Sequence, residues 1–172
     1  MAVGIVIASL VAARSTQAAT QEFTADVGFA QRALYRVPIE LGSLRMTFGA
    51  RGTHLAGGFR TGMDAGRTLE GLTIFQGHAG FVLEYVVGRA RFGFGGGVGI
   101  LSIARATRGD ALTALFLEGT LRIAVDVLRF GPPRPVADDN ADTTRPALFL
   151  AAELELNSAQ VWGPSLAFGV RY

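Results

Sequence analysis

Residues 115–127 read LFLEGTLRIAVDV. The odd positions of this stretch are aliphatic apart from Gly119, whereas the even positions include Glu118, Arg122 and Asp126. Successive side chains of a β-strand point to opposite faces, so a repeat of two residues predicts a strand with one apolar and one polar face. No charged residue falls on the apolar face of this stretch.

The same repeat recurs along the chain and predicts an all-β protein. Together with the segment at about 114–129, alternating segments lie at about 22–32, 43–51, 74–87, 89–103, 146–157 and 161–172. Turn-forming residues separate them, at Tyr35–Glu40, at Gly88-Arg89 and in the loop at 107–110. The Pro- and Asp-rich stretch Gly131–Thr144 is interpreted as a solvated loop inside one domain, because the strand pattern resumes after it.

The composition excludes several classes of function. The chain has 172 residues, and its 16 basic residues, all arginine, against 14 acids give a formal charge of only +2, so no nucleic-acid partner is expected. Cysteine is absent, which excludes disulfides, thiol catalysis and cysteine-based metal sites. With two histidines in the whole chain, no metal site and no cofactor are expected.

The first residues have the length of an export signal. The apolar run Ala2–Ala13 is too short for the roughly 20 residues of a membrane-spanning helix, and small residues follow it. We therefore expect a signal peptide over residues 1–19 and a barrel domain over 20–172, with cleavage after Ala18 or Ala19. A charged start is missing, so a strand or a core helix in the mature protein stays the alternative for this segment.

Alternation alone does not say which face of the sheet is the inside. The alternating runs extend over about ten to thirteen residues, whereas soluble strands average five or six and a tilted membrane strand needs about 9–11. The charged residues all fall on the polar face in the central runs. Both features favour a transmembrane barrel, in which the apolar face is outside. Because such barrels have an even number of strands, we expect an eighth strand at Thr53–Thr61, where the alternation is weaker.

The chain ends with an aromatic residue that follows apolar residues at every second position: Leu166, Phe168, Val170 and Tyr172. This ending resembles the C-terminal β-signal of Gram-negative outer-membrane barrels, and the alternating region is similar to the small OmpA/OmpX-like eight-stranded family. The resemblance implies a closed antiparallel up-and-down transmembrane β-barrel in the outer membrane. It also implies contact with outer-membrane lipid, recognition of the last strand by the barrel-assembly machinery, and a monomer.

A barrel of eight strands encloses just enough room for its own side chains, so we expect a plug rather than a porin-like pore. The inner face should hold a structural ion-pair network, because an unpaired charge there is costly. Its members are expected to be Asp26, Arg45, Glu84, Arg91, Glu118, Arg122, Asp126, Glu153, Glu155 and Arg171. The glycine face at 93–99 should let large neighbours such as Phe116 and Phe149 fill the lumen.

The leading hypothesis is a small outer-membrane barrel with a structural, adhesive or small-solute role and no catalysis. The alternative is a soluble periplasmic or secreted barrel whose apolar face binds a lipophilic ligand inside. A third hypothesis is a surface lipid hydrolase that uses His54 or His78 with Ser102 or Ser158. At Asp138, Asp139 and Asp142 we expect a solvated loop rather than a calcium site. We expect Tyr85, Trp162 and Tyr172 to belong to an aromatic girdle at the membrane–water interface.

Overall fold

The computed structural model describes residues 20–34, 37–68, 71–105, 111–136 and 139–172, and the side chains of all of these except 105 and 134–144. The expected signal segment therefore lies outside the described residues, as does the loop at 107–110. Within the described ranges the chain forms β-strands, and none of its segments is a helix long and apolar enough to cross a membrane.

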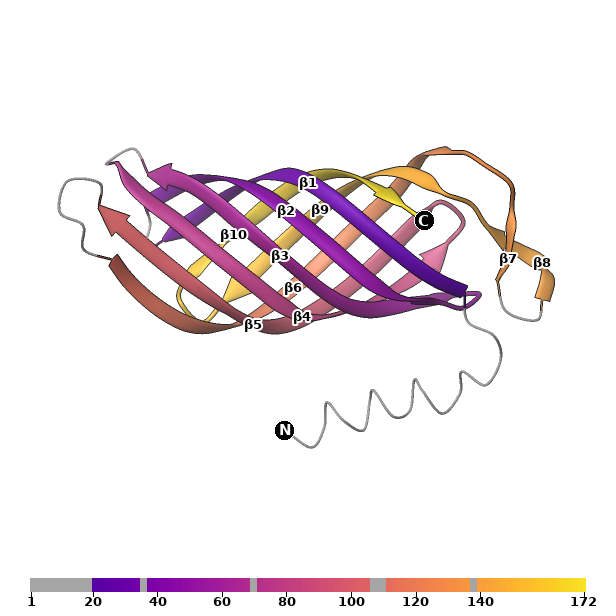
Figure 1. Cartoon of the computed structure of the whole chain (residues 1–172), viewed down its shortest axis with the longest axis horizontal. Helices are drawn as coiled ribbons and strands as arrows, with labels where there is room; N and C mark the ends of the chain where they lie inside the picture. Colours follow the sequence, from indigo (N-terminus) through magenta and orange to yellow (C-terminus); the bar gives the residue numbers. More distant parts are fainter. Residues whose placement is uncertain (1–19, 35–36, 69–70, 106–110, 137–138) are drawn as a thin grey trace, which may run out of the picture.

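Eight long strands close into an antiparallel barrel, which confirms the expected fold class (Figure 1). Each strand pairs with its neighbours along the chain, and the last strand closes the barrel on the first. The barrel strands are β1 Thr20–Leu34, β2 Val37–Arg51, β3 Leu55–Thr68, β4 Leu72–Val87, β5 Ala90–Arg105, β6 Ala111–Arg129, β9 Ala147–Asn157 and β10 Val161–Arg171.

The eighth strand lies where it was expected but extends further. β3 covers Leu55–Thr68, and its inward positions include Arg60 and Asp64, both buried. Its outward positions include glycine, alanine and threonine, so the apolar face is interrupted by small or weakly polar residues. This composition explains why the alternation is hard to recognise over Thr53–Thr61.

Two of the expected turns are wrong in part. Val37–Glu40 belongs to β2, so that strand begins six residues before the expected start at 43, and Pro38 is accommodated near the strand end opposite Ala33. The stretch at 131–144 contains a small hairpin of β7 (Arg134–Val136) and β8 (Asp139–Thr144).

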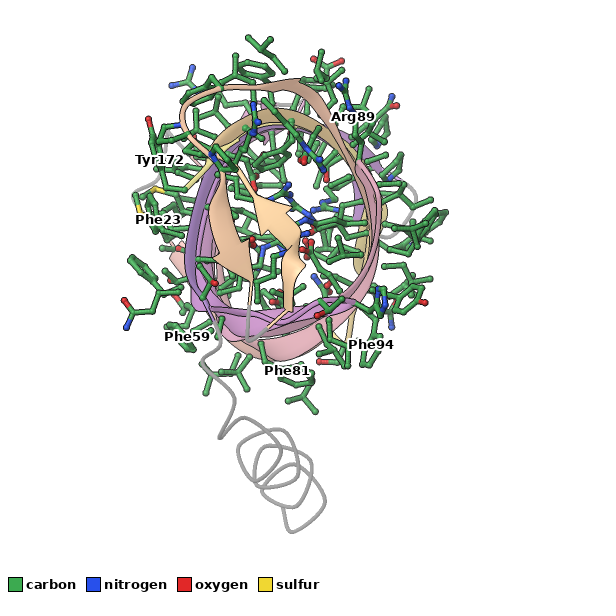
Figure 2. All side chains as sticks on the ribbon, turned by 90° about the vertical axis from the view of Figure 1, so that its right-hand side faces the viewer. Phe23, Phe59, Phe81, Arg89, Phe94 and Tyr172 are labelled. Atoms are coloured by element: carbon green, nitrogen blue, oxygen red, sulfur yellow. The ribbon has the colours of Figure 1, made fainter. Side chains whose placement is uncertain are left out.

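This hairpin lies at the same end of the barrel as residue 20 and the C-terminus, which we call the terminus end (Figure 1). Viewed from that end, β7 and β8 cross in front of the barrel opening (Figure 2). At the opposite end, called the loop end, β1, β3, β5 and β9 end and β2, β4, β6 and β10 begin.

The apolar stripe is on the outside of the barrel. On β6 the side chains of Leu117, Leu121 and Val125 are 67%, 58% and 44% exposed, whereas Arg122 and Asp126 are buried. Figure 2 shows the labelled phenylalanines outside the wall, with nitrogen and oxygen atoms gathered inside it. This arrangement is the opposite of what a soluble carrier with an apolar interior requires.

Glycines on the inner face make room for aromatic rings. A Cβ atom added at Gly99 would overlap the ring of Phe116, whose Cε2 atom would lie 2.6 Å away, and a Cβ at Gly169 would lie 2.6 Å from Cζ of Phe149. Phe116 therefore fills the lumen against the glycine face as expected, whereas Phe149 packs against a glycine of β10.

Gly99→Ala should consequently overpack the lumen. We expect it to lower the free energy of unfolding by about 1–3 kcal/mol, because Phe116 is buried and has little room to move. Urea unfolding in phospholipid vesicles measures the change. Gly119→Ala is the matched control, since a Cβ atom there meets nothing within 4 Å. Equal effects of the two substitutions would contradict this account of the glycine face.

Candidate functional site

Buried ion pairs occupy the lumen near the terminus end. Arg91 on β5 reaches across the barrel and donates to both carboxylate oxygens of Glu22 on β1, at 2.6 and 2.7 Å. Its Nη1 also lies 3.1 Å from Glu84 Oε2 on the neighbouring strand. Arg171 donates to Asp126, which joins the closing strand to β6. The Arg91–Glu22 and Arg171–Asp126 contacts connect strands that are not neighbours in the sheet, and the first of them ties opposite walls of the barrel together.

Glu153 lies among three arginines in the middle of the lumen. Its Oε2 atom is 2.7 Å from Arg60 Nη2 and 3.3 Å from Arg122 Nη1, and its Oε1 atom is 3.7 Å from Arg45 Nε. Arg122 also donates to Asp26 at 3.1 Å. One carboxylate thereby links arginines from β2, β3 and β6.

A second cluster lies towards the loop end around Asp64. Arg45 donates to both oxygens of Asp64, at 2.7 and 3.1 Å, which is the two-pronged geometry that favours arginine over lysine. Arg32 contacts Glu155 at 2.5 Å and also donates to the main-chain oxygen of Gly163. Arg45 Nη2 lies 3.3 Å from the same oxygen of Glu155, and Arg32 Nη2 lies 3.5 Å from Asp64 Oδ2, so each carboxylate contacts both guanidinium groups.

His78 connects this cluster to the next wall. Its Nδ1 atom lies 2.6 Å from Glu118 Oε2, and its Nε2 atom lies 3.3 Å from Asp64 Oδ2. The edge of its ring faces Phe116, with the ring centroids 5.9 Å apart. The imidazole is therefore held between two carboxylates from β3 and β6.

The formal charges of the inward-facing side chains nearly cancel. Without Arg129, which lies at the rim, the described inward-facing side chains include eight carboxylates and seven arginines. Their formal charges sum to −1, and a protonated His78 would bring this sum to zero. The carboxylates belong to Glu22, Asp26, Asp64, Glu84, Glu118, Asp126, Glu153 and Glu155, and the arginines are Arg32, Arg45, Arg51, Arg60, Arg91, Arg122 and Arg171. Opposite charges at contact distance offset the desolvation that burial imposes.

The loop end of the lumen is apolar instead. Seven buried side chains meet there, and we call them the apolar cap: Ala30, Ile39, Leu41, Ile74, Leu101, Phe116 and Val161. The space left among the charged side chains is small, since the two cavities they line measure about 20 and 10 Å³. A cavity needs roughly 10–15 Å³ to hold one water molecule, so each of these two cavities has room for about one water.

Three solved structures have a similar barrel. Neisserial surface protein A is 14% identical over 88% of this chain and 95% of its own, with a TM-score of 0.54. The N-terminal β-barrel domain of OprF from Pseudomonas aeruginosa is 7% identical over 87% of this chain and 97% of its own, with a TM-score of 0.51. Ail, the attachment invasion locus protein of Yersinia pestis, is 8% identical over 88% of this chain and 98% of its own, with a TM-score of 0.50. The fold is that of the small outer-membrane β-barrels. At these identities the similarity establishes the fold alone, and it confirms the resemblance expected from the sequence. No protein-family model and no curated protein matches the chain.

All ten residues expected in the lumen of this outer-membrane barrel fold face inward, and each makes at least one of the contacts above. The contacts above also involve side chains that the expected network omits, namely Glu22, Arg32, Arg60, Asp64 and His78. Arg60 and Asp64 belong to β3, whose pattern is weak, and their even-numbered positions are the signal that identifies them. Arg32 ends an alternating segment, and its inward position could be read from that pattern.

The candidate hydrolase residues are not brought together. Among the contacts of the described residues, His78 bonds to Glu118, whereas the ring of His54 lies 6.2 Å from that of Tyr85 at the terminus end. The hydroxyl of Ser158 accepts the main-chain N–H of Leu117 at 2.9 Å, at the loop end. Ser102 faces outward on β5 opposite Thr113. These positions give no pairing of a serine with an imidazole.

One group of side chains has the residue types of a metal site. Ligand atoms of Asp64, His78 and Glu155 lie within 4.8 Å of one another, and all three residues are buried. The carboxylate oxygens that face inward already accept from Arg32 and Arg45, at distances of 2.5–3.5 Å. Two guanidinium groups would repel a cation, so this arrangement fits an ion-pair cluster and does not fit a metal ion.

The expected assembly signal lies on the outer face of the closing strand, where Leu166, Phe168 and Tyr172 are exposed. Trp162 is exposed near the loop end, and Tyr85 and Tyr172 are exposed near the terminus end. Of the three aspartates of the calcium alternative, Asp138 and the side chains of Asp139 and Asp142 lie outside the described residues.

Proposed function

We propose that the chain spans the outer membrane as a closed barrel with a structural role. The observation that carries the proposal is the uncovered apolar belt around the barrel. On β2, for example, Leu44, Met46, Phe48 and Ala50 face outward, and no charged side chain faces outward over the nine residues from Gly42 to Ala50. A tilted strand needs about 9–11 residues to cross the hydrocarbon of a bilayer, so the belt has a suitable height.

Aromatic side chains at both ends of the belt support the same placement. Trp162 lies outward near the loop end, and Tyr85 and Tyr172 lie outward near the terminus end. Tryptophan and tyrosine favour the membrane–water interface, because their rings are apolar and their polar groups can still reach water. The two aromatic positions therefore fit the two surfaces of a bilayer.

The interior supports a structural role over solute passage. The ion pairs and the apolar cap leave cavities of about 20 and 10 Å³, which are too small for a solute path. Apart from the barrel strands, the described part of the chain contains no β-strand at the loop end that an adhesive surface would use. The β7–β8 hairpin at the terminus end is the larger element beyond the belt.

The proposed partners follow from the outer face. Lipid would cover the apolar belt, and the assembly machinery would recognise the outward row of Leu166, Phe168, Val170 and Tyr172 on β10. We propose a monomer, because the barrel closes on itself and leaves no strand edge unpaired between β1 and β10.

Electrophoresis and bilayer recordings test the proposal together. We expect the unheated, detergent-folded protein to migrate differently from the heated protein, because the closed barrel resists detergent until it is boiled. In planar bilayers we expect no steady channel currents, with a large porin as the positive control. Identical migration together with solubility in plain buffer would contradict the membrane placement, whereas reproducible single-channel steps would contradict the closed lumen.

A further inference from the structure

The outer face carries a groove over four adjacent strands. It is open, with a volume of about 580 Å³, and its outward lining includes Phe92, Phe94, Leu121, Ile123, Ala152 and Leu166. Phe92 pairs with Ile123, Ile123 with Ala152, and Ala152 with Leu166, so one row of residues runs across β5, β6, β9 and β10. Ala152 is the smallest outward side chain in the lining, and the larger Ile123 and Leu166 flank it in the row.

The volume and the lining suit a flexible hydrocarbon. Pockets for small molecules span about 300–1,000 Å³, so the groove is large enough for one fatty-acyl chain. The outward side chains that form it are apolar, and in a bilayer, where lipid replaces water, a chain held along the groove gains van der Waals contact with them.

A cation without a partner lies beyond the terminus-end edge of this groove. Arg89 is exposed in the turn that precedes β5, and its side chain makes no hydrogen bond or ion pair with any residue that the structure describes. At about 3.3 Å per residue, Arg89 is roughly 10 Å along the strand from Phe92. Figure 2 shows Arg89 and Phe94 outside the barrel wall.

A second guanidinium is fixed beside the same turn. Arg129 on β6 donates to the main-chain oxygen of Gly88 at 2.5 Å and to Asp126 at 3.0 Å, while its side chain stays 28% exposed. The turn thus presents one free and one anchored arginine. Asp126 offsets part of the charge of Arg129, so Arg89 supplies the unpaired positive charge and the exposed part of Arg129 supplies further N–H donors for an anion such as a phosphate group.

We propose that this face holds one glycerophospholipid, with its phosphate at Arg89 and Arg129 and one acyl chain in the groove at Ala152. A phospholipid supplies both the anion and the hydrocarbon that the two parts of the site require. A second copy of the chain fits less well, because the outward acid among the described side chains is Glu40, at the opposite end of the barrel. The inference rests on the membrane placement proposed above.

Native mass spectrometry of the full-length protein in detergent, with phosphatidylglycerol added, tests the site. We expect one phosphatidylglycerol to remain bound to the wild type. Arg89→Gln should weaken its retention about fivefold, the effect of removing one arginine at a lipid surface. Ala152→Phe should reduce it to background by filling the groove. Arg67→Gln at the loop end and Ala50→Phe on β2 are the matched controls, and both should retain the lipid.

Three results would overturn the inference. These are equal retention by all four variants, equal retention of a diacylglycerol that lacks the phosphate, and a dimer that Ala152→Phe disrupts. Because Arg89 lies in an exposed turn, its variant should fold even if the Ala152 variant does not. A heat-dependent gel shift measured in parallel separates the two proposals. If the wild type shows the heat-dependent gel shift but retains no phosphatidylglycerol, only the lipid site is contradicted. If the wild type shows no gel shift, the membrane placement is contradicted.

Discussion

Glu153→Gln is expected to lower the free energy of unfolding by about 3–5 kcal/mol, the range found when one partner of a buried ion pair is removed. The carboxylate of Glu153 contacts Arg60, Arg122 and Arg45 at 2.7, 3.3 and 3.7 Å. A neutral amide would leave those guanidinium groups with too little negative charge in a nearly dry lumen. Urea unfolding in phospholipid vesicles, followed by the gel shift, measures the loss.

Glu40→Gln is the matched control for this substitution. Glu40 is an exposed outward acid on β2, so its replacement should change the stability by no more than about 0.5 kcal/mol. The double variant Glu153→Gln with Arg60→Met should be less destabilised than the sum of the two single variants, because it removes a charge of each sign. A loss for Glu153→Gln that equals the loss for Glu40→Gln would show that the lumen ion pairs do not hold the barrel together.

Leu121→Arg is expected to destabilise the barrel in vesicles by about 2–4 kcal/mol, the cost of an arginine at the midplane of a bilayer. Leu121 lies outward on β6, midway between the polar positions Thr113 and Arg129. In a membrane its side chain would therefore lie deepest in the hydrocarbon. The same unfolding measurement in phospholipid vesicles gives the change.

The depth dependence makes this result specific to a membrane. Ala111→Arg, at the loop-end start of the same strand, should cost only about 0–1 kcal/mol. On a water-exposed surface both substitutions should lie within about 0.5 kcal/mol of the wild type. Equal small effects at residues 111 and 121 would therefore contradict the membrane-spanning assignment.

The fold could be predicted from the sequence to a large extent, because side-chain direction in a strand depends on position alone. Once residues 115–127 are read as a strand, Leu117 and Arg122 must lie on opposite faces. The length of the runs and the lack of charge on one face then distinguish an outer belt from an inner core. β3 is harder to predict, because Gly57 and Thr61 interrupt its outward face and weaken the contrast between its two sides.

The site could be predicted only as a set of residue types. Glu22 and Arg91 lie 69 positions apart in the sequence, and their contact depends on the closure of the barrel. His78 is one of the two imidazoles that a hydrolytic site would have to use, yet the structure places it between Asp64 and Glu118. Nothing in the spacing of these residues along the chain indicates that pairing, since each comes from a different strand.

The alternation of the chain by itself determined which side chains face outward and which face inward, because the direction of a side chain from an extended backbone is a local property. Only the tertiary structure decided which inward charges meet, that Ile39, Ile74 and Val161 gather in the apolar cap, and that the β7–β8 hairpin lies at the terminus end. Those features depend on strand register and on closure, which bring distant residues to the same height in the barrel, and no local pattern carries that information.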